Sequence, residues 1–173
     1  MSETPEAAPP GYGAGIVILL VVVIGIVGWI AIGSAISLTS FYASFLFLWY
    51  WATVDKLDIR KFLPSMIGAL IGIALAWGVY ALPAQLGEVP GTILALCLIL
   101  LALYVVIIER VPFAFNPALT LYLTVVAAPA LLTTSNFGEL ALATLLGGAF
   151  FALFVTAVTL IVAKLSKPEE VST

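Results

Sequence analysis

Residues 16–27 read IVILLVVVIGIV, and the apolar stretch around them extends over residues 14–36 without a charged side chain. The hydrocarbon core of a bilayer is roughly 30 Å thick, so one helix needs about 20 mostly apolar residues to cross it. Residues 14–36 meet this length, and they predict a transmembrane helix near the start of the chain.

Stretches of the same kind recur along the whole chain, separated by short polar segments. Together with residues 14–36, we predict transmembrane spans at residues 38–54, 62–82, 92–108, 117–133 and 140–163. The sequence therefore predicts an all-α membrane protein with a bundle of six transmembrane helices. Residues 1–13 and 164–173 are predicted to be short cytoplasmic tails, the first of them disordered, around a single transmembrane domain at 14–163.

The basic residues give this bundle an orientation. All of them fall in the second and fourth connections or after the sixth span: Lys56, Arg60, Lys61, Arg110, Lys164 and Lys167. Basic residues prefer the cytoplasmic side of a membrane, so both termini are predicted to be cytoplasmic. In a five-span alternative, residues 117–133 dip into the membrane and return. The basic residues would then divide between the two sides, which fits the rule less well.

Composition excludes several classes of protein. Hydrophobic residues make up 64% and charged residues 9% of the chain, and its mean hydropathy is +1.26; charged residues make up about 25% of a soluble domain. The net charge of −3 argues against nucleic acid binding. The only cysteine, Cys97, lies in an apolar span, so there is no disulfide framework.

Catalysis, metals and cofactors are not predicted. The chain has no histidine, and no pair of acidic residues lies within a predicted span. Asp55, Glu109 and Glu139 all lie at predicted helix ends, which also argues against proton coupling. Asn136 and Glu139 have the spacing of a capping box that opens the sixth span.

Small residues indicate where helices pack closely, because close backbone approach supplies much of the attraction between helices in lipid. The predicted packing residues are Gly25, Gly28, Gly68, Gly72, Gly147 and Gly148. They lie in spans one, three and six, which we expect to pack together, while span four, which has no glycine, is expected to face lipid. The alternative is that a face of small residues forms a subunit interface.

The two halves of the chain predict a 3+3 inverted repeat. A shift of about 76 residues places spans one to three on spans four to six and aligns Gly72 with Gly148. Because each half has three spans, the halves would have opposite orientations. Transporters built in this way place their pathway between the halves, near the middle of the membrane.

Under this overlay, residues 37–40 and 113–116 begin spans two and five from opposite sides of the membrane. Free N–H groups at such helix starts can hold an anion or a polar solute. The segment Asn116-Pro117-Ala118 resembles the half-helix motif of aquaporins, although that family carries two such motifs in a longer chain. The alternative is that Asn116 is an ordinary N-cap followed by proline at the first helical position.

Polar side chains in and before spans two and five are the candidates for lining a pathway: Ser40, Ser44, Asn116, Thr120, Tyr122 and Thr124. Thr120 and Thr124 share one helix face, as do Ser40 and Ser44. Alternatively, these hydroxyls can donate to carbonyls of their own helix. Pro129 within span five predicts a bend in that helix.

Two runs of sequence resemble a known group of membrane proteins. Residues 49–53 (WYWAT) with 68–72 (GALIG), and residues 116–124 with 143–149 (ATLLGGA), resemble the membrane module of the fusaric acid resistance and aromatic acid exporter group. The chain length and the pair Gly28-Trp29 are similar to a family of small bacterial inner-membrane proteins known as a domain of unknown function. The exporter resemblance implies a six-helix module of the bacterial inner membrane that moves organic anions, although the large cytoplasmic domain of many exporters is absent.

The sequence therefore predicts a small transporter or channel module for a small organic anion or a neutral polar solute. Its predicted partners are the lipid bilayer and either further copies of itself or another membrane subunit. The alternative is a structural or accessory subunit without a pathway of its own. The two differ in whether the hydroxyls of spans two and five face a wet cavity or are buried against Leu and Phe.

Overall fold

The computed structural model describes residues 11–165, which fold into helices without any strand. In chain order these helices are α1 (Tyr12–Ala35), α2 (Phe41–Thr53), α3 (Ile59–Leu86), α4 (Glu88–Ile107), α5 (Pro117–Val126), α6 (Pro129–Leu132) and α7 (Phe137–Leu165). The predicted all-α class is therefore confirmed.

Four of the described helices, α1, α3, α4 and α7, are long and apolar enough to cross a membrane. The helices in predicted spans two and five are shorter. The α2 helix has 13 residues and α5 has 10, which correspond to about 20 Å and 15 Å at 1.5 Å per residue. The chain thus combines four long apolar helices with two short ones.

The fifth predicted span differs most from the structure. Residues 117–133 were expected to form one bent helix, but α5 ends at Val126 and the four-residue α6 begins at Pro129. Proline has no N–H to donate and its ring restricts the preceding residue, so the helical bonding stops before it. Span two is also shorter than predicted, because residues 38–40 precede α2.

The predicted tails lie partly outside the described residues. Tyr12 and Gly13 already belong to α1, and Lys164 belongs to α7. Residues 1–10 and 166–173, with Lys167, are outside the described range, so the prediction of a disordered N-terminal tail is not tested there.

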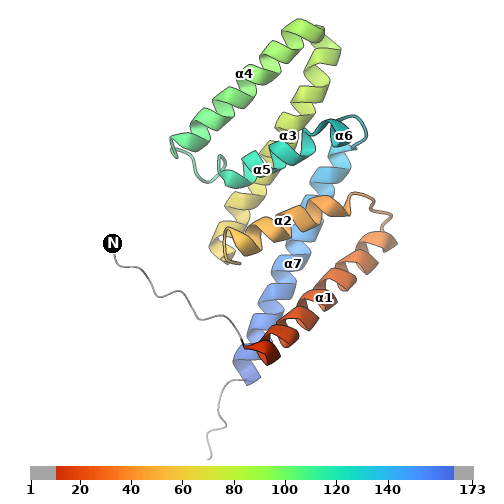
Figure 1. Ribbon diagram of the computed structural model, residues 1–173, viewed down its shortest axis with the longest axis vertical. Helices are drawn as coiled ribbons and strands as arrows, with labels where there is room; N and C mark the ends of the chain where they lie inside the picture. Colours follow the sequence, from red (N-terminus) through yellow and green to blue (C-terminus); the bar gives the residue numbers. More distant parts are fainter. Residues whose placement is uncertain (1–10, 166–173) are drawn as a thin grey trace, which may run out of the picture.

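The two longest helices organise the rest of the bundle. Helices α3 and α7 contact each other, α4 and α5 pack on α3, and α1 and α2 pack on α7. Figure 1 shows the short helices α2 and α5 in the middle of the elongated molecule, with the α3–α4 hairpin at one end and the α1–α7 pair at the other. Each long central helix therefore carries one short helix and one outer helix.

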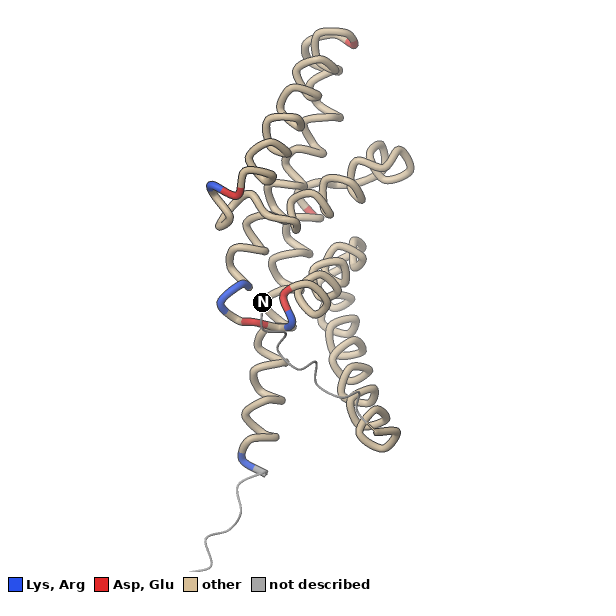
Figure 2. The backbone as a smooth tube through the Cα atoms, turned by 60° about the vertical axis from the view of Figure 1, so that its left-hand side comes forward, with Lys and Arg blue, Asp and Glu red and all other residues tan. Residues whose placement is uncertain are grey.

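The ends of the helices divide between two sides. In Figure 1 the start of α1, the α2–α3 and α4–α5 loops and the end of α7 lie toward the left, and the other connections lie toward the right. Lys and Arg residues are blue in Figure 2. The described basic residues all lie in these left-hand segments or directly beside them: Lys56, Arg60, Lys61, Arg110 and Lys164. The acidic Glu88 and Glu139 begin α4 and α7 on the opposite side.

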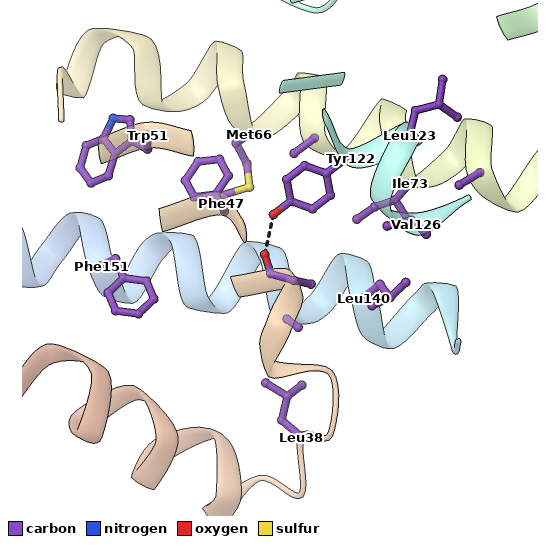
Figure 3. Close-up of a cluster of buried hydrophobic side chains, with 14 of the residues drawn as sticks. Leu38, Phe47, Trp51, Met66, Ile73, Tyr122, Leu123, Val126, Leu140 and Phe151 are labelled. Atoms are coloured by element: carbon purple, nitrogen blue, oxygen red, sulfur yellow. Dashed lines mark hydrogen bonds between the residues drawn. The ribbon is translucent and has the colours of Figure 1, made fainter. Parts of the chain in front are cut away.

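The centre of the bundle is a cluster of buried side chains from α2, α3, α5 and α7. Figure 3 shows Phe47, Met66 and Tyr122 of three different helices around one another. Phe62 makes edge-on contacts with the rings of Phe47 and Trp51, with centroids 5.4 Å apart in each pair. This cluster fixes the short helices against the long ones.

The glycines of α3 and α7 face the short helices. A Cβ at Gly72 would stand 2.5 Å from the carbonyl oxygen of Leu119 in α5, and one at Gly68 would overlap the side chain of Asn116. On α7, Gly147 stands against Ser44 of α2, and Gly148 stands against Met66 of α3 and, slightly farther away, Phe47 of α2. The close contacts of α3 and α7 are thus made mostly with α5 and α2.

The outer helices are more exposed. Gly25 and Gly28 of α1 face Phe154 and Phe150 of α7. Apart from Gly25, the residues that α1 buries are Trp29 and Gly33. Helix α4 packs on α3 through Gly91 and two alanines, and its large side chains are mostly exposed, as expected for span four. Between α3 and α4, Gly87 has a φ of 93°, a conformation that L side chains rarely adopt.

Candidate functional site

A pocket of about 460 Å³ opens where the end of α2, the start of α3 and the start of α5 meet. These segments belong to the side of the molecule that carries the described basic residues. The pocket is lined by Tyr50, Asp55, Lys61, Pro64, Ser65, Pro112, Phe113, Asn116 and Pro117. Its volume is within the range of small-molecule sites, about 300–1,000 Å³.

Asp55 is the unusual member of this lining. Its side chain is only 6% exposed, and Ser65 Oγ donates to its Oδ2 at 2.5 Å. Aspartate is almost never this buried unless it is paired, because removing a carboxylate from water is costly. No ion pair of Asp55 occurs within residues 11–165, so a single hydroxyl is its side-chain partner there.

The loop that carries Asp55 is held in an unfavourable backbone conformation. Lys56 and Leu57 have φ values of 55° and 60°, in the left-handed region that non-glycine residues rarely occupy. Two hydrogen bonds hold the loop to α2: Leu57 N donates to Trp51 O at 2.9 Å, and Trp51 Nε1 donates to Asp58 O at 3.0 Å. Such strain is concentrated at functional sites in proteins.

Asn116 lies on the opposite wall of the pocket and ties α5 to α3. Its Oδ1 accepts a hydrogen bond from Ala118 N at 3.0 Å, so the predicted N-cap role is confirmed. Its Nδ2 donates to Pro64 O at 2.8 Å and to Pro112 O at 3.3 Å. Both donors of the amide and one acceptor position of its oxygen are therefore used to position the start of α5, and Asn116 also lines the pocket.

Two of the predicted pathway residues join helices in the interior. Ser44 Oγ donates to Ala143 O of α7 at 2.7 Å, and Tyr122 Oη donates to Ala43 O of α2 at 2.5 Å. Figure 3 shows the second bond as a dashed line within the buried cluster. Both Ser44 and Tyr122 are fully buried among Leu, Phe and Ala side chains, and neither lines the pocket.

Tyr122→Phe should lower the free energy of unfolding by about 1 kcal/mol, because the ring stays in place while one buried hydrogen bond is lost. The measurement is equilibrium unfolding of the purified protein in mixed micelles of increasing SDS content. Tyr104→Phe is the matched control, since Tyr104 is 60% exposed on α4. Equal stability of the two variants would mean that the bond from Tyr122 to α2 contributes nothing.

The other predicted pathway residues do not converge on one space. Thr120 and Thr124 donate to Pro117 O and Thr120 O of their own helix at 2.8 and 2.7 Å. Ser40 is buried at the far end of α2. Of the six predicted residues, only Asn116 lines the pocket.

At the start of α2, one carboxylate oxygen replaces a local cap. Glu139 Oε1 of α7 accepts hydrogen bonds from Thr39 N at 2.6 Å, Thr39 Oγ1 at 2.7 Å and Ser40 N at 2.9 Å. Asn136 Oδ1 accepts from Glu139 N at 3.2 Å, as the predicted capping box requires. The carboxylate itself, however, joins the start of α7 to the start of α2.

Sequence reasoning missed the main features of the pocket. Asp55 was interpreted as a charge at a helix end, Tyr50 was noted only as part of the aromatic run at residues 49–53, and Ser65 was not singled out. The available signal was a carboxylate five residues after Tyr50 and ten residues before Ser65. Spacing along one chain does not show that the intervening loop folds back and buries the acid.

No family model, curated protein or solved structure matches this chain. The resemblance to the exporter group therefore stays a prediction, and function has to be inferred from the chain's own residues.

Proposed function

We propose that this chain is a membrane protein that crosses the bilayer six times and passively conducts a small polar solute. The observation that carries the proposal is the pocket at the start of α5, which joins a buried carboxylate, hydroxyls and an amide between the two halves of the chain. Polar groups converging in an otherwise apolar bundle are typical of a solute site.

Six crossings are supported by the two sides of the molecule. Successive connections alternate between the sides in Figure 1, and the basic residues lie on the side of both described ends, as the positive-inside rule prefers for cytoplasmic termini. Helices α3 and α7, with 28 and 29 residues, are about 42 Å long. They exceed the thickness of the hydrocarbon core, so in this proposal they cross it with some tilt or extend into the headgroup regions. The short α2 and α5 cross more directly, with residues 37–40 and α6 completing their passage.

An inverted repeat is supported by the pattern of contacts. Helices α4 and α5 of the second half pack on α3 of the first, and α1 and α2 of the first half pack on α7 of the second. A hydrogen bond also joins the start of each short helix to the long helix on which it packs. Asn116, before α5, donates to Pro64 O of α3, and Thr39, before α2, donates to Glu139 of α7. The aligned glycines both contact the short helix of the opposite half: Gly72 contacts Leu119 of α5, and Gly148 contacts Phe47 of α2 in addition to Met66 of α3.

The pocket favours one of the two solute classes expected from sequence. A buried carboxylate repels an organic anion in a medium of low dielectric constant. Neutral polar solutes and cations are not repelled in this way. We therefore propose a small, non-anionic polar solute. Passive conduction is proposed because the charged residues of the described helices lie near helix ends.

The test is to block the pocket and measure flux. In a Cys97→Ser background, Phe113→Cys places a thiol at the pocket lining. The purified protein is labelled in detergent with a bulky methanethiosulfonate and reconstituted into proteoliposomes. Uptake of urea, glycerol and small amines is then compared with that of unlabelled protein. We expect labelling to remove most of the uptake above that of empty vesicles.

Val111→Cys in the same background is the matched control. Val111 is 45% exposed in the same loop but does not line the pocket, so its labelling should leave uptake unchanged. Absence of uptake by the unlabelled, folded protein would overturn the transport proposal. Equal inhibition at both positions would remove the pocket from the pathway.

A second candidate function is an accessory membrane subunit, either assembled with further copies of itself or with another protein. It is favoured by the hydroxyls of Ser44 and Tyr122, which join helices and do not line a cavity. This candidate predicts no uptake by the reconstituted protein alone, so the flux measurement separates it from transport.

A further inference from the structure

We infer that the pocket binds the cationic N–H group of its solute, an ammonium or a guanidinium, on the carboxylate of Asp55. The inference rests on the proposed function, because it takes the same pocket to be the solute site. It narrows the solute from any non-anionic polar molecule to an organic cation that donates hydrogen bonds.

The first support is the incomplete pairing of Asp55. A carboxylate has two oxygens and about four acceptor positions. Ser65 Oγ donates one hydrogen bond to Oδ2, and the side chain of Asp55 is only 6% exposed. Asp55 also lines the pocket, and we take the acceptor positions that Ser65 leaves unused to face the solute. A charge-assisted hydrogen bond from a cation is the strongest interaction that could satisfy them.

The second support is the position of Asp55 after a helix end. Helix α2 ends at Thr53, two residues before Asp55. The C-terminus of α2 carries a partial negative charge, which adds to the attraction of the carboxylate for a positive group and opposes the partial positive charges at the starts of α3 and α5 beside the same pocket. A cation bound at Asp55 would therefore lie close to the end of α2 as well as to the carboxylate.

The third support is the aromatic lining. Tyr50 and Phe113 contribute to the same pocket, Tyr50 from α2 and Phe113 from the α4–α5 loop. The face of an aromatic ring attracts ammonium and guanidinium groups. A carboxylate beside two aromatic side chains provides both a charge partner and a surface for the apolar part of an organic cation.

Lys61 is the cation that the pocket already contains. It lines the pocket but its side chain is exposed, and it makes no ion pair within residues 11–165. Its ammonium therefore does not pair with Asp55. The same positive charge repels a cationic solute that enters the pocket. Removing Lys61 should strengthen cation binding, whereas removing the charge of Asp55 should weaken it.

The experiment compares methylguanidinium with N-methylurea, which have nearly the same shape but differ by one positive charge. Methylguanidinium is permanently charged and does not cross lipid as a free base. Binding to the full-length protein in detergent is measured by saturation-transfer NMR, and uptake is measured separately in proteoliposomes. We expect wild-type protein to bind methylguanidinium about tenfold or more tightly than N-methylurea.

Two variants test whether the charge of Asp55 causes this preference for methylguanidinium. Asp55→Asn keeps the size of the side chain and should remove the preference, and Lys61→Met should preserve or increase it. The wild-type preference does not depend on how Asp55→Asn folds. Persistence of the preference in folded Asp55→Asn, or its loss in Lys61→Met, would overturn the assignment to Asp55.

The binding and uptake results separate the two proposals. Preferential binding without any uptake would support the cation site and overturn transport. Uptake without a preference for methylguanidinium would support transport and overturn the cation site. Preference in both measurements would support both.

Discussion

Gly72→Ala should destabilise the protein by about 1–3 kcal/mol, the usual cost of inserting an extra methyl group into a close-packed interior. The new Cβ would stand 2.5 Å from Leu119 O, 2.8 Å from Tyr122 Cβ and 3.0 Å from Leu123 N. Two of these atoms are backbone, so a side-chain rotation cannot make room. Helix α5 would have to move away from α3, and the bond between Tyr122 and α2 would lengthen with it.

Gly78→Ala is the matched control on the same helix. The nearest atom to a Cβ at Gly78 is Leu82 Cδ1, at 3.8 Å. Alanine should therefore be tolerated there, and it favours a helix over glycine by about 0.5–1 kcal/mol. Equilibrium unfolding in SDS mixed micelles measures both variants. If Gly72→Ala were as stable as Gly78→Ala, the packing of α5 on α3 would be looser than described.

Glu139→Ala should release the start of α2 from α7 and lower the thermal unfolding temperature. One carboxylate oxygen accepts the hydrogen bonds of Thr39 N, Thr39 Oγ1 and Ser40 N. Without it, N–H groups at the start of α2 lose their acceptor, and the N-cap Ser40 supplies no side-chain cap of its own. Thermal unfolding in detergent, followed by tryptophan fluorescence, measures the change.

Glu139→Gln should be intermediate, because an amide oxygen still accepts hydrogen bonds but lacks the charge that strengthens them. Glu88→Ala is the control, since Glu88 also lies in the first turn of an apolar helix. A loss of stability in Glu88→Ala equal to that in Glu139→Ala would mean that the effect comes from any acidic residue at a helix start.

The sequence predicted those parts of the fold that depend on local hydrophobicity. The four long helices follow from uninterrupted apolar stretches, and the start of α5 follows from Asn116-Pro117, where an N-cap and a proline coincide. Pro129 indicated a disturbance in the fifth span, but a bend was predicted where the helix is in fact interrupted. The helix ends at Val126, three residues before this proline.

The pocket could not be predicted in the same way, because it depends on contacts between distant residues. Asp55 looks like a solvated charge until the α2–α3 loop folds back and Ser65 closes on it. Tyr122 looks like a lining residue until Ala43 of another helix accepts its hydroxyl. Periodicity shows which face of a helix is polar, whereas the partner of that face depends on the tertiary packing.

The bond between Thr39 and Glu139 also bears on how the protein is made. The two residues are 100 positions apart, so at about 5–20 residues per second a ribosome needs roughly 5–20 s to reach the second after the first. During that time α2 has neither its cap nor α7, the long helix on which it packs. We expect α2 to settle into the bilayer only after translation of the last helix, which leaves its start accessible in the nascent chain.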